Sequence, residues 1–152
     1  NYHTGPSQSA GQLVFESLRD NMANYTGKRV VITGHSLGNQ MALVVSKKIK
    51  EGIQAGNTNA KLKPARIALL DPFYSKGKKD YLNNRWTGAV ARDYADELKN
   101  WGVSIEVTRG KSPYLVVTNG DMQLDIYTAA SGEWLKMIGD TAAMPFNLHA
   151  VR

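Results

Sequence analysis

The sequence predicts an α/β fold organised around a parallel β-sheet. Three segments carry apolar residues at helical spacing, and each is followed by a short strand-like run. Two of these runs are apolar without alternation, which is typical of strands covered on both faces, as in parallel sheets. Helices that alternate with such strands along the chain favour parallel strands joined by right-handed crossovers.

The first helix and the first strand are predicted within residues 9–32. Ser9 and Gln12 match a capping box, so the helix should open at Ser9, and Gly27 marks its end. Its apolar stripe consists of Val14, Leu18 and Met22. The β-branched run 30–32 then predicts a strand that is buried on both faces.

Two further helix–strand pairs follow. The second helix should stop at Gly52, and residues 67–70 predict the next buried strand after a polar loop. The third helix should close at Gly102, and residues 103–108 predict a third strand. The apolar faces of these helices consist of Ala42, Val45 and Ile49 in the second, and Val90, Tyr94 and Leu98 in the third.

The pattern changes after the third strand. The pair 119–120, Asn-Gly, is a strong hairpin signal between residues 113–118 and 121–128. Apolar residues alternate with polar ones in the second of these segments, which predicts a half-buried strand. Residues 131–139 fit either a third strand of this meander or a short helix, and the last stretch is irregular.

Composition excludes several classes of protein. The chain has 152 residues, of which 42% are hydrophobic and 21% charged, so it is globular rather than disordered. Cysteine is absent, which rules out a disulfide scaffold and any thiolate metal site. The net charge of +6 favours anionic surfaces, but no P-loop, dinucleotide fingerprint or aromatic-interleaved basic motif supports nucleotide or nucleic-acid binding.

Residues 34–38, Gly-His-Ser-Leu-Gly, match G-x-S-x-G between a predicted strand and a predicted helix. A nucleophilic serine must project from a sharp strand-to-helix turn, and glycines on either side remove Cβ atoms that would clash there. The helix N-terminus favours a developing oxyanion, and the N–H of Leu37 is expected to be one oxyanion donor. Ser36 is therefore the predicted nucleophile, while His35, on the same tight turn, is interpreted as a packing or positioning residue.

Residues 30–43 (VVITGHSLGNQMAL) resemble the nucleophile region of α/β-hydrolases, particularly lipases. Residues 68–72 (ALLDP) resemble the G-L-D-P segment of the pancreatic lipase family. The resemblance covers approximately residues 10–110 and implies Asp71 as the acid of a catalytic triad. The family order of serine, aspartate and histidine implies His149 as the base.

Other residues compete for the triad roles. Asp121 and Asp125 are alternatives to Asp71, because the acid follows the next strand in many hydrolases and an Asp-Pro pair is a common turn. The position after the next strand reads TRGKSP and lacks a carboxylate, which favours Asp71, although Asp121 stays open as an alternative. His149 is the only histidine after Asp71, whereas His3 precedes the serine.

The chain also departs from the family pattern. Asn39 replaces the second glycine of the common G-H-S-L-G-G, and Leu69 replaces the glycine of G-L-D-P. Residues 1–152 are predicted to form a single α/β-hydrolase-like domain that is incomplete at the N-terminus, since the family places several strands before the serine. Three parallel strands and a hairpin would leave an apolar strand edge open to aggregation. We therefore expect a second chain or a missing segment to complete the sheet.

These features predict a serine hydrolase that cleaves carboxylic esters through an acyl-enzyme, with an ester or lipid substrate and no metal or organic cofactor. The alternatives are a catalytically inactive hydrolase-like binding protein and a basic domain that binds a lipid surface or polyanion. Two lysine clusters fit either a solvated face or docking to an anionic membrane; they are Lys47, Lys48 and Lys50, and Lys76, Lys78 and Lys79. The lipase resemblance favours secretion, while the composition leaves the compartment open.

Overall fold

The computed structural model confirms the α/β fold and describes residues 6–36, 38–72, 74, 86–109, 121–126 and 135–138. Its elements in chain order are α1 (Pro6–Asn21), β1 (Arg29–His35), α2 (Gly38–Gln54), the 3₁₀ turn η2 (Ala60–Leu62), β2 (Pro64–Leu70), α3 (Gly88–Asn100), β3 (Ser104–Thr108), β4 (Asp121–Ile126) and β5 (Leu135–Ile138).

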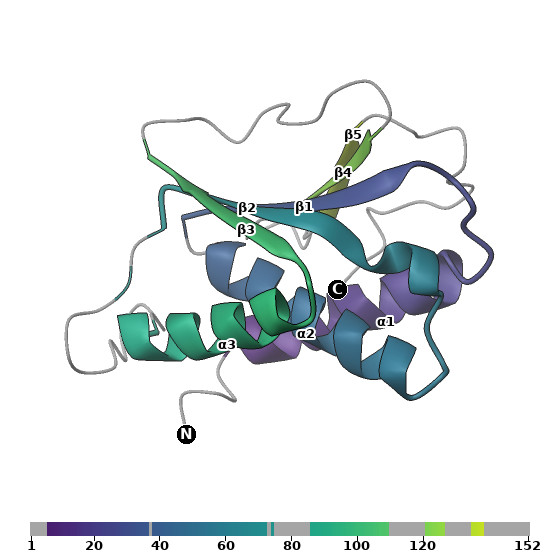
Figure 1. Cartoon of the computed structure of the whole chain (residues 1–152), viewed down its shortest axis with the longest axis horizontal. Helices are drawn as coiled ribbons and strands as arrows, with labels where there is room; N and C mark the ends of the chain where they lie inside the picture. The colour runs from purple at the N-terminus through teal and green to yellow at the C-terminus, as the bar shows by residue number, and fades with distance from the viewer. Residues whose placement is uncertain are drawn as a thin grey trace.

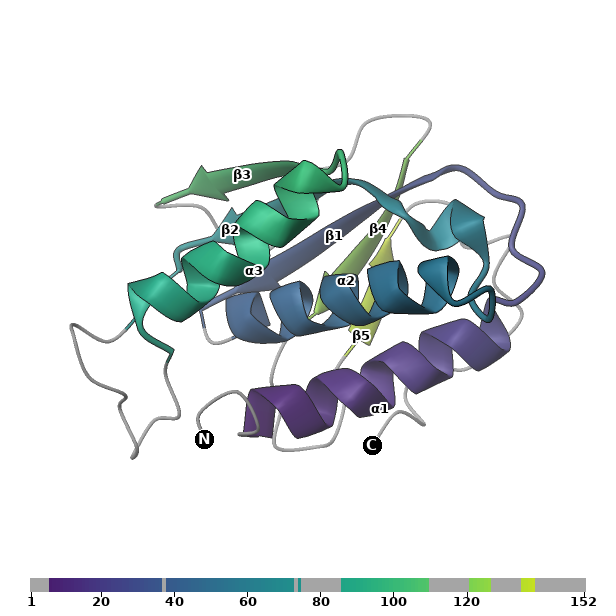
Figure 2. The same ribbon diagram turned by 60° about the horizontal axis from the view of Figure 1, so that its bottom comes forward.

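The strands form one sheet in the order β3-β2-β1-β4-β5. The first four of these are parallel to their neighbours, and β5 runs antiparallel to β4. Helices α1, α2 and α3 lie side by side on one face of the sheet (Figures 1 and 2). The parallel sheet predicted from the alternation of helices and strands is therefore confirmed.

The expected open apolar edge does not fall on β1. β1 pairs with β2 on one side and with β4 on the other, so it lies inside the sheet and its residues 30–34 are all buried. The segment predicted to form an outlying half-buried hairpin strand supplies this second partner. The edge strands of the sheet are β3 and β5 instead. The expectation that a second chain or a missing segment completes the sheet stays a prediction.

β4 differs from its predicted half-buried state, because all six of its residues are buried. Its polar side chains find partners on β1. Thr33 donates a buried hydrogen bond of 2.7 Å from Oγ1 to the Asp125 carboxylate, and Gln123 lies within 3.4 Å of the same hydroxyl. Buried polar groups are tolerated when they are hydrogen-bonded in this way. The Asn-Gly turn before β4 lies outside the described residues, and residues 135–138 resolve the choice left for 131–139 in favour of a strand.

Three predicted helix boundaries move, and one of them is the end of α1, which lies at Asn21 rather than at Gly27. α1 begins at Pro6 rather than at the Ser9 capping box, in keeping with the tolerance of proline in a first helical turn. α2 continues through Gly52 to Gln54. It ends where Gly56 adopts a φ of 80°, with Asn57 N–H donating to the Gly52 carbonyl at 3.0 Å in the pattern of a Schellman motif. The predicted stop at Gly52 is therefore wrong, because the helix ends at Gln54 and the glycine that terminates it is Gly56.

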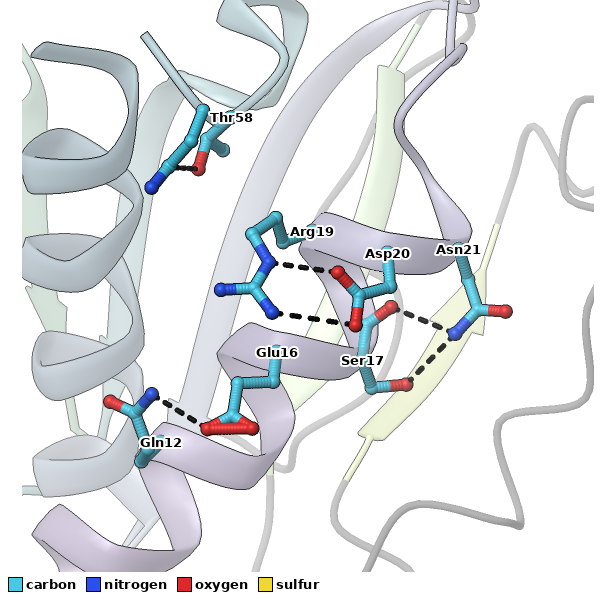
Figure 3. Close-up of polar contacts among 8 residues, drawn as sticks. Gln12, Glu16, Ser17, Arg19, Asp20, Asn21 and Thr58 are labelled. Atoms are coloured by element: carbon cyan, nitrogen blue, oxygen red, sulfur yellow. Dashed lines mark hydrogen bonds and ion pairs between the residues drawn. The ribbon is translucent and has the colours of Figure 1, made fainter. Parts of the chain in front are cut away.

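The core lies between the helices and the sheet. The predicted stripe of α1 and the predicted apolar faces of α2 and α3 are all buried. The outward side of α1 carries polar contacts instead (Figure 3), with Gln12 donating to Glu16 at 2.8 Å and Arg19 to Asp20 at 2.8 Å. The hydrogen bond and charge of Arg19 lower the pKa of the Asp20 carboxyl. Such exposed pairs contribute little, so α1 is held mainly by its buried stripe.

The helices that the structure describes are too short or too polar to span a bilayer.

Helix α1 approaches α2 closely at Gly11, which generates a stability prediction. A Cβ at Gly11 would collide with the Val44 side chain, whereas a Cβ at Gly88 of α3 would meet nothing within 4 Å. We expect Gly11→Ala to lower the free energy of unfolding by about 1–3 kcal/mol through overpacking. Gly88→Ala should raise it by about 0.5–1 kcal/mol through helix propensity. Urea unfolding of both variants measures the difference, and equal shifts would contradict the α1–α2 packing.

Candidate functional site

Two strand ends in the structure carry strained backbone. Among the described residues, Ser36 and Asp71 are the only non-glycine residues with positive φ, at 54° and 46°. Left-handed conformations are uncommon for residues with a Cβ and cluster at functional sites, where surrounding structure holds them in place. Ser36 follows β1 and Asp71 follows β2, so each forms a corner at the end of its strand.

The register of the sheet brings these two corners together. His35 of β1 is paired with Leu70 of β2, and the Ser36 N–H then donates to the Leu70 carbonyl at 3.1 Å. The Asp71 N–H in turn donates to the Thr108 carbonyl of β3 at 2.8 Å. The corners therefore extend the parallel ladder by one step at the carboxyl edge of the sheet, where α/β proteins bind their ligands.

The first glycine of the motif is required by close packing. An ideal Cβ at Gly34 would lie 2.5 Å from the carbonyl oxygen of Gly38 and 3.0 Å from the Ala42 Cβ. Gly34 is the last residue but one of β1, and Gly38 opens α2. The absence of a side chain at Gly34 is what lets the helix start directly beside the strand end.

The His35 side chain lies close to Asp71. Its Nε2 is 3.8 Å from Asp71 Oδ2, and both side chains are a little over a third exposed, at 38% and 36%. This separation is too long for a hydrogen bond, but it lies within ion-pair range when the imidazole is protonated. The geometry agrees with a positioning role for His35 next to the carboxylate.

The rival carboxylates occupy other places in the sheet. Asp121 is buried at the start of β4, where Arg29 Nη2 lies 2.9 Å from its carboxylate and register pairs the two residues. It is therefore separated from Ser36 by the length of β1, roughly 20 Å. Asp125 lies within the sheet and accepts the hydrogen bond from Thr33.

Two of the predicted site residues, Leu37 and His149, lie outside the described residues. Of the lysines, Lys47 and Lys50 both lie near Glu97, at 3.6 and 3.3 Å, which fits the interpretation of a solvated, charge-paired helix face. The lysines of the loop at 76–79 are also outside the described residues. Within the part of the chain that is described, no three His, Asp or Glu side chains gather as a metal ion would require.

Sequence reasoning missed three residues around the Asp71 corner. Arg109 Nη1 donates to the Pro72 carbonyl at 2.8 Å and so connects the end of β3 to this turn. Tyr74 lines a hollow of about 240 Å³ between α3, β2 and β3, and its burial raises its pKa to about 12. Asn39, noted only as a departure from a glycine, is fully buried at the start of α2 and contacts both corners.

Comparison with known proteins gives a match to a family model that covers the first part of the chain. The family model described as lipase (class 3) matches residues 2–63, a span that contains α1, β1, α2 and Ser36. The match supports, in general, a lipase-like hydrolase of the α/β-hydrolase type. No curated protein and no solved structure gave a match.

The contact at Gly34 predicts a large effect of a small substitution. Gly34→Ala should lower the free energy of unfolding by about 2–3 kcal/mol, because the added Cβ meets backbone atoms that a rotamer change cannot move away. Thermal unfolding measures this, with Gly88→Ala as the control for adding the same methyl group in open space. A Gly34→Ala protein as stable as the wild type would show that the strand end and α2 are not in contact.

The raised pKa of Tyr74 predicts a pH dependence of stability. In the unfolded chain a tyrosine ionises near pH 10, whereas the buried Tyr74 keeps its proton to about pH 12. The unfolded state therefore loses this proton first, so the contribution of Tyr74 to stability is constant below about pH 10 and falls between about pH 10 and 12, by up to about 1.4 kcal/mol per pH unit. Urea unfolding of wild type and Tyr74→Phe across this range should show a steeper fall in the wild type, and the difference between the two curves gives the contribution of Tyr74. Parallel curves would place Tyr74 in solvent.

Proposed function

We propose that the chain is a serine hydrolase that cleaves carboxylic esters through an acyl-enzyme, with Ser36 as nucleophile, His149 as general base and Asp71 as the carboxylate that orients it. One observation carries this proposal: the two left-handed corners, Ser36 and Asp71, lie at adjacent strand ends joined by the hydrogen bond from Ser36 to Leu70. Strained backbone at two neighbouring polar residues is the expected cost of presenting side chains for chemistry.

The proposed reaction has two steps. In the first, Ser36 Oγ attacks the ester carbonyl while the His149 imidazole accepts its proton, and the same proton then passes to the departing alcohol. In the second, His149 takes a proton from water, the resulting hydroxide attacks the acyl carbon, and the proton returns to Ser36 as the carboxylic acid leaves. The negative charge on the carbonyl oxygen develops near the start of α2, where helix N–H groups, including that of Leu37, stabilise it.

The choice of Asp71 rests on its place in the sheet. It follows the strand beside β1 and its carboxylate faces the residue next to the nucleophile, 3.8 Å from His35. Its sequence context, ALLDP, resembles the acid segment of pancreatic lipases. Asp121 is at the other end of β1, paired with Arg29, and Asp125 is engaged by Thr33. The register thus supports Asp71 over both alternatives.

A fluorophosphonate probe tests the nucleophile directly, because it phosphonylates an activated serine. We expect the wild type to be labelled at Ser36, and Ser36→Ala to lose both labelling and hydrolysis of a short-chain p-nitrophenyl ester. Asp71→Asn and His149→Ala should each lower kcat by roughly 10³- to 10⁴-fold. Asp125→Asn is the matched control, since it changes a carboxylate of the adjacent strand and should retain kcat within about fivefold.

Three results would overturn parts of this proposal. Folded wild-type protein that resists the probe would indicate a hydrolase-like binding protein. Binding to anionic vesicles that salt abolishes, without any ester turnover, would indicate a basic surface-binding domain instead. Loss of activity in Asp125→Asn with full activity in Asp71→Asn would transfer the role of triad acid to the neighbouring strand.

A further inference from the structure

We propose that Asn39 is a positioning residue that holds the two corners of the site in fixed relation; this inference rests on the proposed function. Asn39 lies in the first turn of α2 and its exposed fraction is 0%. The glycine expected at this position from the family resemblance has no side chain to play such a part. The proposed role therefore depends on a side chain that the family pattern lacks at this position.

The carboxamide of Asn39 contacts both corners at once. Its Nδ2 donates to the Ser36 carbonyl at 2.6 Å and to the Leu70 carbonyl at 3.1 Å. The first carbonyl belongs to the corner after β1, and the second immediately precedes Asp71, the corner after β2. The amide nitrogen of Asn39 thus joins the carbonyls of two residues that are 34 positions apart in the sequence.

These hydrogen bonds are not needed to satisfy the backbone. The Leu70 carbonyl already accepts from the Ser36 N–H at 3.1 Å, and the Ser36 carbonyl already accepts from the N–H of Asn39 at 3.2 Å. Both carbonyls would keep a partner if the side chain were removed. Satisfying buried polar groups, the usual reason for a buried asparagine, therefore does not account for this one.

The side chain also carries an energetic cost. Asn39 Oδ1 is buried and has no hydrogen-bond partner among the residues that the structure describes. A buried acceptor without a partner destabilises the folded state, whereas an apolar or absent side chain would avoid the penalty. The Asn39 side chain is not required to satisfy the two carbonyls, and its buried acceptor lowers the stability of the folded state. The geometry that its two donated hydrogen bonds impose is the best explanation for its presence.

That geometry bears on the reacting groups through planar peptide units. The Ser36 carbonyl shares its plane with the following N–H, which is the proposed oxyanion donor, and the Leu70 carbonyl shares its plane with the Asp71 N–H. Holding both carbonyls fixes the tilt of both planes. Asn39 consequently sets the direction of an oxyanion donor and the place of the triad carboxylate without touching the substrate.

Asn39→Ala tests this role, and Ser46→Ala is the matched control. Ser46 is equally buried in α2 and donates only to the Ala42 carbonyl of its own helix, at 2.7 Å. We expect Asn39→Ala to slow fluorophosphonate labelling of Ser36 and to lower kcat by about 10- to 100-fold, the range produced by small misplacements of catalytic groups. KM should change less than about twofold, and circular dichroism should show a folded protein. Ser46→Ala should keep its labelling rate within about twofold, whatever its effect on stability.

The outcomes separate this inference from the function on which it rests. If the wild type is labelled and Asn39→Ala is labelled equally fast, the positioning role is wrong and the serine hydrolase stands. If the wild type is not labelled, both fail. Should Asn39→Ala not fold, Asn39→Ser replaces it, because a serine hydroxyl is too short to reach both carbonyls and should give the same loss of kcat at constant KM. A rise in KM with unchanged kcat in either variant would also overturn the proposal.

Discussion

The hydrogen bond between the Ser36 N–H and the Leu70 carbonyl is the constraint on which the site depends. This hydrogen bond continues the β1–β2 ladder one residue beyond the end of β1. The backbone after β1 is therefore held in a sharp turn. Leu70 is the last residue of β2, and the next residue in the chain, Asp71, turns in the same left-handed sense. One register, set by the apolar faces of two strands, thereby places a hydroxyl and a carboxylate at a common edge.

The packing of the rest of the molecule holds Ser36 and Asp71 in their strained backbone conformations. β1 lies inside the sheet with partners on both edges, and α2 starts so close to Gly34 that no side chain fits between them. The helices pack together on one face (Figure 2), and apolar side chains of each, such as Leu18, Leu43 and Leu98, are fully buried. Conformations that cost free energy locally persist when packing of this kind leaves the backbone no alternative.

Local patterns in the sequence were sufficient for β1, β2, the helical stripes and the sharp turn at Ser36, because each depends on neighbours within a few positions. They were insufficient for β4. Its alternating pattern indicated a half-exposed strand, but Asp125 is buried because Thr33, 92 residues earlier, donates to it. Asn39 was undervalued for the same reason, since its two acceptors come from different strands. Contacts between distant segments determine both cases, and a single sequence does not display them.

The position of β4 beside β1 also has a kinetic consequence. The central strand of the sheet, β1, can pair with β4 only after β4 has been synthesised. The contacting residues of the two strands are 92 positions apart in the sequence. Contacts of such long range are slow to form, and in the interval the unpaired edge of β1 is open to other nascent chains. A chain interrupted between β3 and β4 would retain that exposure permanently, so the interval before β4 is synthesised is the period in which β1 is most vulnerable to misassembly.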